Sequence, residues 1–345
     1  MKKIFLIISV LILVISGCNR DAIVNSNNPV ISTAKKGLYI LCEGSGAGTS
    51  RLSYYDLDTI FYASIFKPGS LGLYPDGLIS DGTNLYITEQ GNYNAQGKIY
   101  KVDTGGTVIN SQDIGLNPHS LCTANNKIYV TNGPAGNVAV VDKDNLNTIK
   151  TINVGTNPQE IFSAFSKVYV CNSGNFVSPH DSTVSVIDAK TDAIINTITL
   201  RNSPTSIAMS NDNYLLIGCQ GSSGMIFMVD PNYFDKLDSF TVAGGFGKDI
   251  SVDADSYDIY FISYDNKIVK LNLYSGVSQV IIDNPSPANV NYYGYVFDSK
   301  TKNHYVANAR NFVSSGLIYK FDYSGNMLNY YNTGIAPRRF LLIDY

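Results

Sequence analysis

Seven residues with hydrogen-bonding side chains recur along the chain at intervals of 40 to 46 residues. They are Asp76, His119, Gln159, Thr205, Lys248, Tyr293 and Arg338. The set combines an acid, an imidazole, an amide, two cations and two hydroxyls, so it can donate and accept hydrogen bonds at once. We predict that these seven, called the mouth residues, bind a polar ligand. A funnel filled only with water is the alternative.

Catalysis has weaker support in the sequence. The three histidines, His119, His180 and His304, lack the paired spacing of a metal site. A hydrolase or lactonase would need clustered carboxylates, and the one candidate set is Glu43, Asp76, Glu89 and His119. We therefore expect no enzymatic activity, no metal and no cofactor.

The elements that position the mouth residues follow from a sequence repeat. Residues 117–155 and the stretch after them are two copies of one pattern, and each copy begins with a proline and a short apolar strand. The first copy continues with NKIYVTN, VAVVD and TIKTINVG, and the second continues with SKVYVCN, VSVID and AIINTITL. β-Branched and aromatic residues fill these phrases, and Gly, Asn and Asp mark the turns. Each unit is therefore predicted to hold four strands, and the period indicates stacked units. The units begin at Pro75, Pro118, Pro158, Pro204, Gly247, Tyr292 and Pro337.

The two ends of the chain complement each other. The C-terminal PRRFLLIDY supplies one strand, whereas GLYILCE, RLSYYD and IFYASIF near the other end supply three. Joining them completes a seventh blade and removes the exposed edge of an open sheet. We predict an all-β, seven-bladed β-propeller over residues 37–345, with four-stranded blades and a ring closed by the C-terminal strand joining the N-terminal blade. The mouth residues would then surround one opening of the central channel.

The phrase IYVTNGPAGNVAVVDKDNLNTIKTINVGTNPQEI resembles the consensus of the YVTN β-propeller repeat of bacterial and archaeal surface proteins. The resemblance is strong over residues 115–201 and weak after residue 245. It implies the propeller fold and says little about function. Because the chain has no tryptophan, it does not resemble the quinoprotein propellers, whose blades share tryptophan docking motifs.

Two further groups of residues are candidates for the same opening. The first group ends each YVTN-like strand, and its members, the strand-end residues, are Glu43, Glu89, Asn132, Asn172, Gln220, Tyr264 and Asn308. The second group consists of Tyr93, Phe176 and Phe312, on long loops over residues 90–96, 173–181 and 309–315. Amides suit a polar ligand, and aromatic side chains on loop tips suit binding. An ordinary strand-end turn is the alternative for the amides.

Other recurring residues are predicted to be structural. Cys42, Cys122, Cys171 and Cys219 should be free buried thiols, because equivalent positions in neighbouring blades lie beyond the reach of a disulfide. An acid or amide ends each third strand, and we expect Asx turns there, on the opposite face, rather than a metal site. These residues are Asp56, Asp103, Asp142, Asp188, Asp230, Asn272 and Asp322.

The N-terminal segment indicates export. Lys2 and Lys3 precede an apolar run over residues 4–15 that is too short to span a bilayer, and the following ISGC is similar to a bacterial lipobox. We predict a signal peptide over residues 1–17, lipidation of Cys18 and a flexible tether over residues 18–36. An ordinary signal peptide or an anchor helix is the alternative. Asn19, where an Asp would favour inner-membrane retention, favours the outer membrane. We predict separately that the chain faces the cell surface, with Asp21 as the one acidic residue near Cys18.

These predictions combine into a hypothesis about function. The formal net charge of −3 is not that of a nucleic-acid binder. The lipobox, tether and YVTN-like blades are similar to the cobalamin-capturing propeller lipoproteins that sit over TonB-dependent transporters. That resemblance implies capture of a small molecule such as a corrinoid, or of a glycan, on one propeller face and its transfer to an outer-membrane transporter. The alternative is a protein-interaction scaffold at the cell surface without a small ligand.

Overall fold

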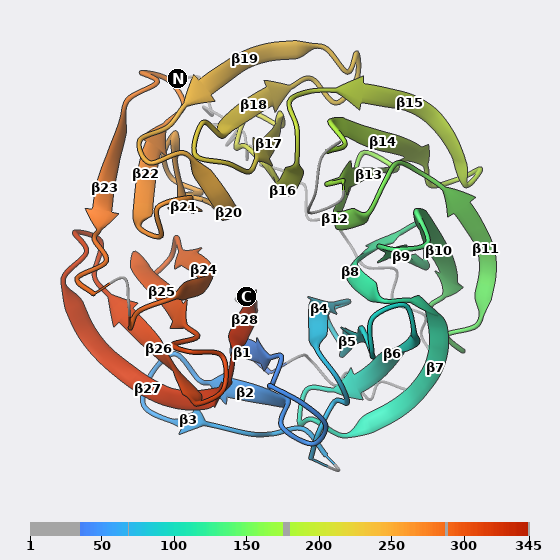
Figure 1. The fold of residues 1–345 in the computed structure, drawn as a ribbon, viewed down its shortest axis with the longest axis horizontal. Coiled ribbons are helices and arrows are strands. Elements are labelled where there is room, and N and C mark those ends of the chain that lie inside the picture. Colours follow the sequence, from blue (N-terminus) through green and yellow to red (C-terminus); the bar gives the residue numbers. More distant parts are fainter. Residues whose placement is uncertain (1–34, 68, 175–179, 287–288, 344–345) are drawn as a thin grey trace, which may run out of the picture. The chain divides into compact units, whose positions relative to one another are not determined.

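Four-stranded antiparallel sheets follow one another around a central channel (Figure 1). The computed structural model describes residues 35–67, 69–174, 180–286 and 289–343. Within these residues the strands form seven sheets, and no residue is helical. The prediction of an all-β, seven-bladed propeller is therefore confirmed.

Each blade runs from an innermost to an outermost strand. Blade 1 contains β4 (Pro75–Ser80), β5 (Asn84–Glu89), β6 (Gln96–Asp103) and β7 (Val108–Leu116). Blade 2 contains β8 (Pro118–Ala124), β9 (Lys127–Asn132), β10 (Asn137–Asp142) and β11 (Thr148–Asn153). Blade 3 contains β12 (Pro158–Ala164), β13 (Lys167–Asn172), β14 (Thr183–Asp188) and β15 (Ala193–Thr199).

The remaining blades follow the same plan. Blade 4 contains β16 (Pro204–Met209), β17 (Leu215–Cys219), β18 (Met225–Val229) and β19 (Lys236–Thr241). Blade 5 contains β20 (Phe246–Val252), β21 (Asp258–Ser263), β22 (Ile268–Asn272) and β23 (Ser278–Ile282). Blade 6 contains β24 (Tyr292–Asp298), β25 (Asn303–Asn308), β26 (Ser315–Phe321) and β27 (Met327–Ile335). Blade 7 contains β28 (Pro337–Ile343), β1 (Gly37–Cys42), β2 (Arg51–Tyr55) and β3 (Phe61–Tyr62).

The hydrophobic core lies between neighbouring blades. Tyr129 and Val140 of blade 2, for example, pack with Val168 and Val170 of blade 3, and all four are fully buried. Burial of each such side chain stabilises the fold by about 1.5–3 kcal/mol. The apolar second strands are therefore sandwiched by the blades on either side, which is why the YVTN-like phrases show no alternation of polar residues.

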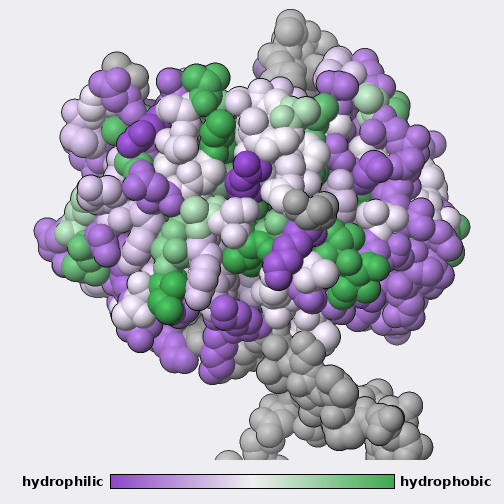
Figure 2. All heavy atoms as spheres, turned by 90° about the horizontal axis from the view of Figure 1, so that it is seen from below, coloured by the Kyte–Doolittle hydropathy of each residue, from purple (hydrophilic) through white to green (hydrophobic). Residues whose placement is uncertain are grey.

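The rim of the ring is formed by the outermost strands. The edge-on view in Figure 2 shows hydrophobic groups separated by hydrophilic ones. Ile149 of β11 and Met327 of β27 are about half exposed, at 57% and 55%. Single exposed apolar side chains of this kind are common on soluble proteins. Nothing in the described part of the chain is a helix long and apolar enough to cross a membrane.

A β-bulge interrupts the start of every innermost strand. In blade 2, Pro118 pairs with Asn132 and Leu121 pairs with Val130, so two residues of β8, His119 among them, face one residue of β9. The same register shift occurs in the six other innermost strands. A bulge takes a residue out of the ladder and redirects its side chain. In every blade except blade 5, the bulge contains the mouth residue.

Threonine at the third position of the YVTN phrase completes the bulge. Thr131 Oγ1 accepts a hydrogen bond from the Ser120 amide at 3.0 Å and donates to the Gln159 carbonyl of blade 3 at 2.7 Å. Thr88 likewise accepts from the Gly77 amide at 2.8 Å and donates to a carbonyl of blade 2. The threonine therefore links two blades beside the mouth residues.

The chain's two ends close the ring. Strand β28 pairs with β1, so that Leu38 is opposite Leu342 and Ile40 is opposite Phe340, and Figure 1 shows the C-terminal end beside β1. This confirms the predicted closure as far as Ile343. Tyr345, Cys18, the predicted signal peptide and most of the predicted tether lie outside the described residues.

One predicted blade start is corrected by the structure. Strand β20 begins at Phe246 rather than Gly247. Gly247 is instead the extra residue of the bulge, and a Cβ there would lie 2.7 Å from the carbonyl oxygens of Ile262 and Ser263 in β21. The other predicted starts coincide with the first residue of a strand.

Candidate ligand-binding site

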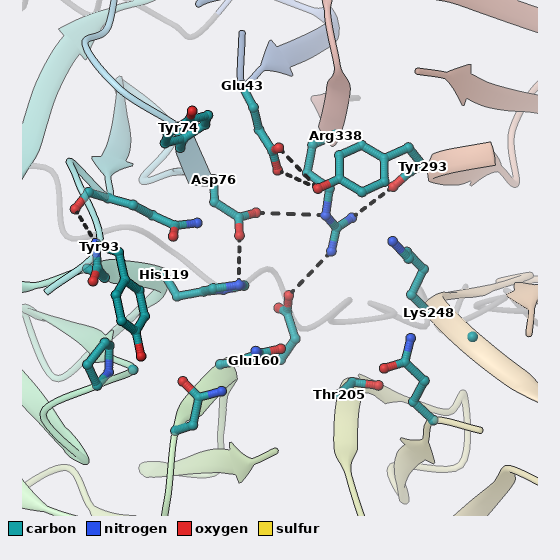
Figure 3. A pocket seen from close by; sticks show the side chains of 18 residues that line it. Glu43, Tyr74, Asp76, Tyr93, His119, Glu160, Thr205, Lys248, Tyr293 and Arg338 are labelled. Atoms are coloured by element: carbon teal, nitrogen blue, oxygen red, sulfur yellow. Dashed lines mark hydrogen bonds and ion pairs between the residues drawn. The ribbon is translucent and has the colours of Figure 1, made fainter. Parts of the chain in front are cut away.

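All seven mouth residues line one cavity at the opening of the channel (Figure 3). Each comes from the innermost strand of a different blade, and the cavity has a volume of about 470 Å³. Sites for small molecules typically fall between about 300 and 1,000 Å³. The repeated bulge thus gathers residues that are up to 262 positions apart in the sequence around one space, as the repeat predicted.

The strand-end residues divide into two groups. Glu43 and Gln220 line the cavity, and Tyr264 lines an adjoining pocket. Strands β1, β17 and β21 each end one residue before these positions, so the three side chains are released from the ladder. The register of blades 4, 5 and 7 therefore places them where the mouth residues lie.

The other four strand-end residues turn inward, which corrects their predicted place at the opening. Glu89, Asn132, Asn172 and Asn308 are buried and still paired with the first residue of the inner strand. Each bonds within its own blade; Asn172, for instance, donates to Thr183 and Ser185 at 2.9 and 3.0 Å. The alternative reading, an ordinary strand-end role, describes these four.

The aromatic loop residues also differ from one another. Tyr93 is 81% exposed and lines the cavity. Its loop is held by Asn117, which accepts from the Asn94 amide at 2.7 Å and donates to the carbonyls of Gln90 and Asn92. Phe312 lines the adjoining pocket, whereas Phe176 lies outside the described residues.

Ionisable side chains from five blades meet in the channel and form one network, called the ion network. Its members are Asp76, His119, Glu160, Asp249, Arg338 and Arg339. His119 Nε2 lies 2.8 Å from Asp76 Oδ2, and Arg339 Nη2 lies 3.0 Å from Asp76 and 2.6 Å from Glu160. Arg338 Nη1 lies 3.0 Å from both carboxylate oxygens of Asp249. Salt bridges thus bind the innermost strands of distant blades to each other.

The ion network shifts the acidity of its members. Burial alone would raise the pKa of Asp76, but His119 and the two arginines hold it well below its usual value. Burial likewise opposes ionisation of Glu160, yet Arg339 and His119 lower its pKa. Both carboxylates are therefore ionised at neutral pH and matched by nearby cations. Removing one partner would leave a buried charge uncompensated.

Three members of the ion network were missed by the sequence reasoning. Glu160, Asp249 and Arg339 each follow directly after a mouth residue. A signal was available, because a charged residue follows the mouth residue in only these blades. In blade 3 both Gln159 and Glu160 lie outside the ladder, whereas in blade 7 Arg338 is the bulged residue and Arg339 pairs with Leu41.

A second cluster on the opening joins Glu43, Lys248 and Tyr293. The Tyr293 hydroxyl donates to Glu43, 3.0 Å from both carboxylate oxygens, and Lys248 Nζ lies 4.3 Å from the centre of the Tyr293 ring. Burial and the nearby Asp76 raise the pKa of Glu43 to about 7. Burial and the nearby Arg338 lower the pKa of Lys248 to about 8. Both groups can therefore change charge near neutral pH.

An adjoining pocket of about 240 Å³ extends the cavity between blades 5 and 6. Lys248, Tyr293 and Gln220 line both spaces. Phe312 packs edge-on against Tyr293, with 4.9 Å between the ring centres, and Tyr264 is 56% exposed. We call Tyr264, Tyr293 and Phe312 the aromatic shelf. The opening thus offers a polar space beside an aromatic one.

Three members of the candidate catalytic set, Glu43, Asp76 and His119, line the cavity, and the fourth, Glu89, does not. Glu89 accepts hydrogen bonds from the Leu73 amide and the Tyr100 hydroxyl and does not line the cavity. His304 is fully buried in blade 6, where Nδ1 lies 2.7 Å from the Tyr295 hydroxyl. Over the described ranges, no three metal-binding side chains are grouped closely enough to hold an ion.

The opposite face repeats one turn. Asp56, Asp103, Asp142, Asp188, Asp230, Asn272 and Asp322 each accept hydrogen bonds from backbone amides two to four residues later. The predicted Asx turns are confirmed in all seven blades. Cys42, Cys122, Cys171 and Cys219 are buried free thiols, as expected.

Comparisons with known proteins support the fold alone. No protein-family profile matches the chain, and no curated protein sequence matches it. The chain is similar to a Quinonprotein alcohol dehydrogenase-like protein from Bacteroides thetaiotaomicron, with a TM-score of 0.70 and 16% identity over 90% of this chain and 79% of that one. It is also similar to the hydrazine synthase of Kuenenia stuttgartiensis (TM-score 0.59, 18% identity, 72% and 76% covered). A hypothetical selenium-binding protein from Sulfolobus tokodaii gives a TM-score of 0.65 and 10% identity, with 89% and 93% covered. The YVTN resemblance therefore rests on the residues quoted above.

Proposed function

We propose that the chain is a lipid-anchored capture protein that binds a small polar molecule at the channel opening and passes it to an outer-membrane transporter. The observation that carries the proposal is the single cavity lined by one mouth residue from every blade. Its residues provide the donors, acceptors and charges that recognition of a polar molecule requires.

The orientation of blade 7 supports capture. Cys42, at one end of β1, pairs with Pro337 beside the cavity, whereas Gly37 begins β1 at the opposite face. A tether that continues from Gly37 towards Cys18 would leave the molecule on the face away from the opening. The cavity would then stay accessible to a ligand or a transporter while the lipid holds the protein to the membrane.

Ligand binding can be tested by isothermal titration of the full chain in detergent. Cyanocobalamin, a neutral oligosaccharide and an acidic oligosaccharide serve as probes. A Gln159→Trp variant, which fills the cavity from an inner-strand position, should abolish any saturable heat that the wild type gives. Absence of saturable heat with every probe at millimolar concentration would contradict the proposal.

Lipid attachment needs a separate test. Cells grown with radiolabelled palmitate should label the wild-type chain but not a Cys18→Ser variant, and the label should sediment with outer membranes. An unlabelled wild-type chain would contradict the anchor without affecting the cavity.

A scaffold role is the second candidate. The loops around the opening, such as residues 90–96 and 220–224, are rich in Asn, Gln, Gly, Ser and Tyr, a composition that also suits protein recognition. A scaffold would retain its partner in a pull-down after Lys248→Met, because protein contacts would spread over the loops. A capture protein would lose its small ligand instead.

A further inference from the structure

Lys248 is the charged side chain of the cavity without a carboxylate partner. Arg338, the other strong cation there, is bound to Asp249, and both arginines contact Asp76 or Glu160 within 3.9 Å. Among the described residues, no hydrogen bond or salt bridge reaches Lys248, whose ammonium lies over the Tyr293 ring. Figure 3 shows its side chain directed into the opening.

The acids around Lys248 are already engaged. Asp249 is paired with Arg338, Asp76 with His119 and Arg339, and Glu43 accepts the Tyr293 hydroxyl. Because the neighbouring carboxylates already have partners, the Lys248 ammonium can bind an anionic group of a ligand that enters the cavity. A carboxylate suits this role, because it can accept from an ammonium in a charge-assisted hydrogen bond.

The remaining lining indicates what carries that carboxylate. Gln90, Gln159 and Gln220 bring amides to the cavity, and each amide can both donate to and accept from a hydroxyl. The aromatic shelf begins beside Lys248 and offers ring faces on which the C–H side of a sugar can pack. Hydroxyls, a flat apolar face and an acid occur together in a carboxylated sugar.

We infer that the ligand of this cavity is an acidic sugar, a uronic-acid residue of a glycan, whose carboxylate binds Lys248 while its ring packs on the aromatic shelf. This inference rests on the proposed capture function. It adds the chemical class of the ligand and the residues that discriminate it from neutral sugars and from corrinoids. The cavity volume of about 470 Å³ suits one or two sugar rings.

A matched pair of probes tests the inference. The full chain in detergent is titrated with oligogalacturonate and with its fully methyl-esterified form, which keeps the rings and hydroxyls but lacks the charge. The acid should bind on the order of 10- to 100-fold more tightly than the ester, the range expected for one hydrogen bond between charged groups. Lys248→Met should remove this difference, and the control Lys236→Met, on the exposed rim strand β19, should keep it.

The aromatic shelf is tested with Tyr264→Ala, which should lower the affinity for oligogalacturonate by about 3- to 10-fold. Tyr274→Ala, 86% exposed on the opposite face, is the control and should have no effect. Equal binding of acid and ester would overturn the inference while leaving capture intact, as would binding of cyanocobalamin alone. If no probe binds, the proposed function fails together with it. If Lys248→Met misfolds, the lower affinity of the ester for the wild type still decides the question.

Discussion

The two faces of the propeller use the same repeat in opposite ways. On the face opposite the cavity, the residue at the end of the third strand is Asp in six blades and Asn in the seventh, and each is consumed by its own turn. At the cavity, the mouth position on the innermost strand of each blade carries a different side chain. These seven side chains line one shared cavity. The residues that repeat from blade to blade hold the backbone turns, whereas the residues that vary on the rigid frame are the candidates for recognising a ligand.

The largest effect is expected from opening the ring, because both faces depend on its closure. Deleting residues 336–345 removes β28 and leaves the edge of β1 unpaired along its whole length. The loss of one inner strand exceeds the margin of stability of a typical domain. Circular dichroism should show no cooperative thermal transition, and a melting transition equal to that of the full chain would contradict closure.

The second prediction separates the faces by stability. Arg339→Met removes the guanidinium that bridges the buried Asp76 and Glu160, and should lower the free energy of unfolding by about 3–5 kcal/mol. Asp142→Ala, which removes one Asx turn from the opposite face, should lower it by only about 1 kcal/mol. Urea unfolding measures both, and equal losses would show that the channel charges are not coupled across blades.

The third prediction separates the faces by acidity. Because the pKa of Glu43 is raised to about 7, the folded state binds its proton more tightly than the unfolded state. The free energy of unfolding should therefore fall between about pH 4.5 and 7, by about 3 kcal/mol, and Glu43→Gln should remove this fall. Urea unfolding at a series of pH values measures it.

The Asx turns should titrate the other way. Backbone amides of Thr191 and Lys190 lower the pKa of Asp188. Its stabilising contribution is present above pH 3.8 and is lost as the pH falls further. Carboxyl ¹³C NMR can follow both groups, and a Glu43 that titrates with the Asx-turn aspartates would contradict the difference between the faces.

The smallest effect on stability is expected at the loop tips. Tyr93→Ala and Tyr233→Ala each remove a tyrosine that is more than three-quarters exposed. The free energy of unfolding should therefore change by less than about 0.5 kcal/mol in either variant. Only Tyr93 lines the cavity. Its loss should weaken a bound probe several-fold in calorimetry, and an equal loss with Tyr233→Ala would place binding elsewhere.

Most of the fold could be predicted from the sequence because the same pattern of four strands recurs in every blade. The strand phrases, the Asx turns and the complementary ends were each readable from residue types, and the spacing of the mouth residues gave their common location. The place of the strand-end residues was harder to predict, because it depends on the residue at which the second strand of each blade ends. A one-residue difference in where β1, β17 and β21 end decides that Glu43, Gln220 and Tyr264 reach the opening while Asn132 and Asn172 do not.

The ion network was also hidden in the sequence, for a physical reason. Glu160 and Arg339 are 179 positions apart, and only the closed ring with its bulges brings them to 2.6 Å. Spacing along the chain predicts which residues share a level of the channel, but charge pairing across the channel depends on side-chain reach. Such pairs become visible only once the number of blades is fixed.

The central claim is that a ligand engages the varied face and leaves the repetitive one untouched. Hydrogen–deuterium exchange of the full chain, with and without saturating oligogalacturonate, reads every blade in one experiment. The account predicts slower exchange in peptides over residues 90–96, 117–119, 245–248 and 309–315, and no change in the seven Asx turns. Protection confined to the Asx turns, with the opening unchanged, would contradict it.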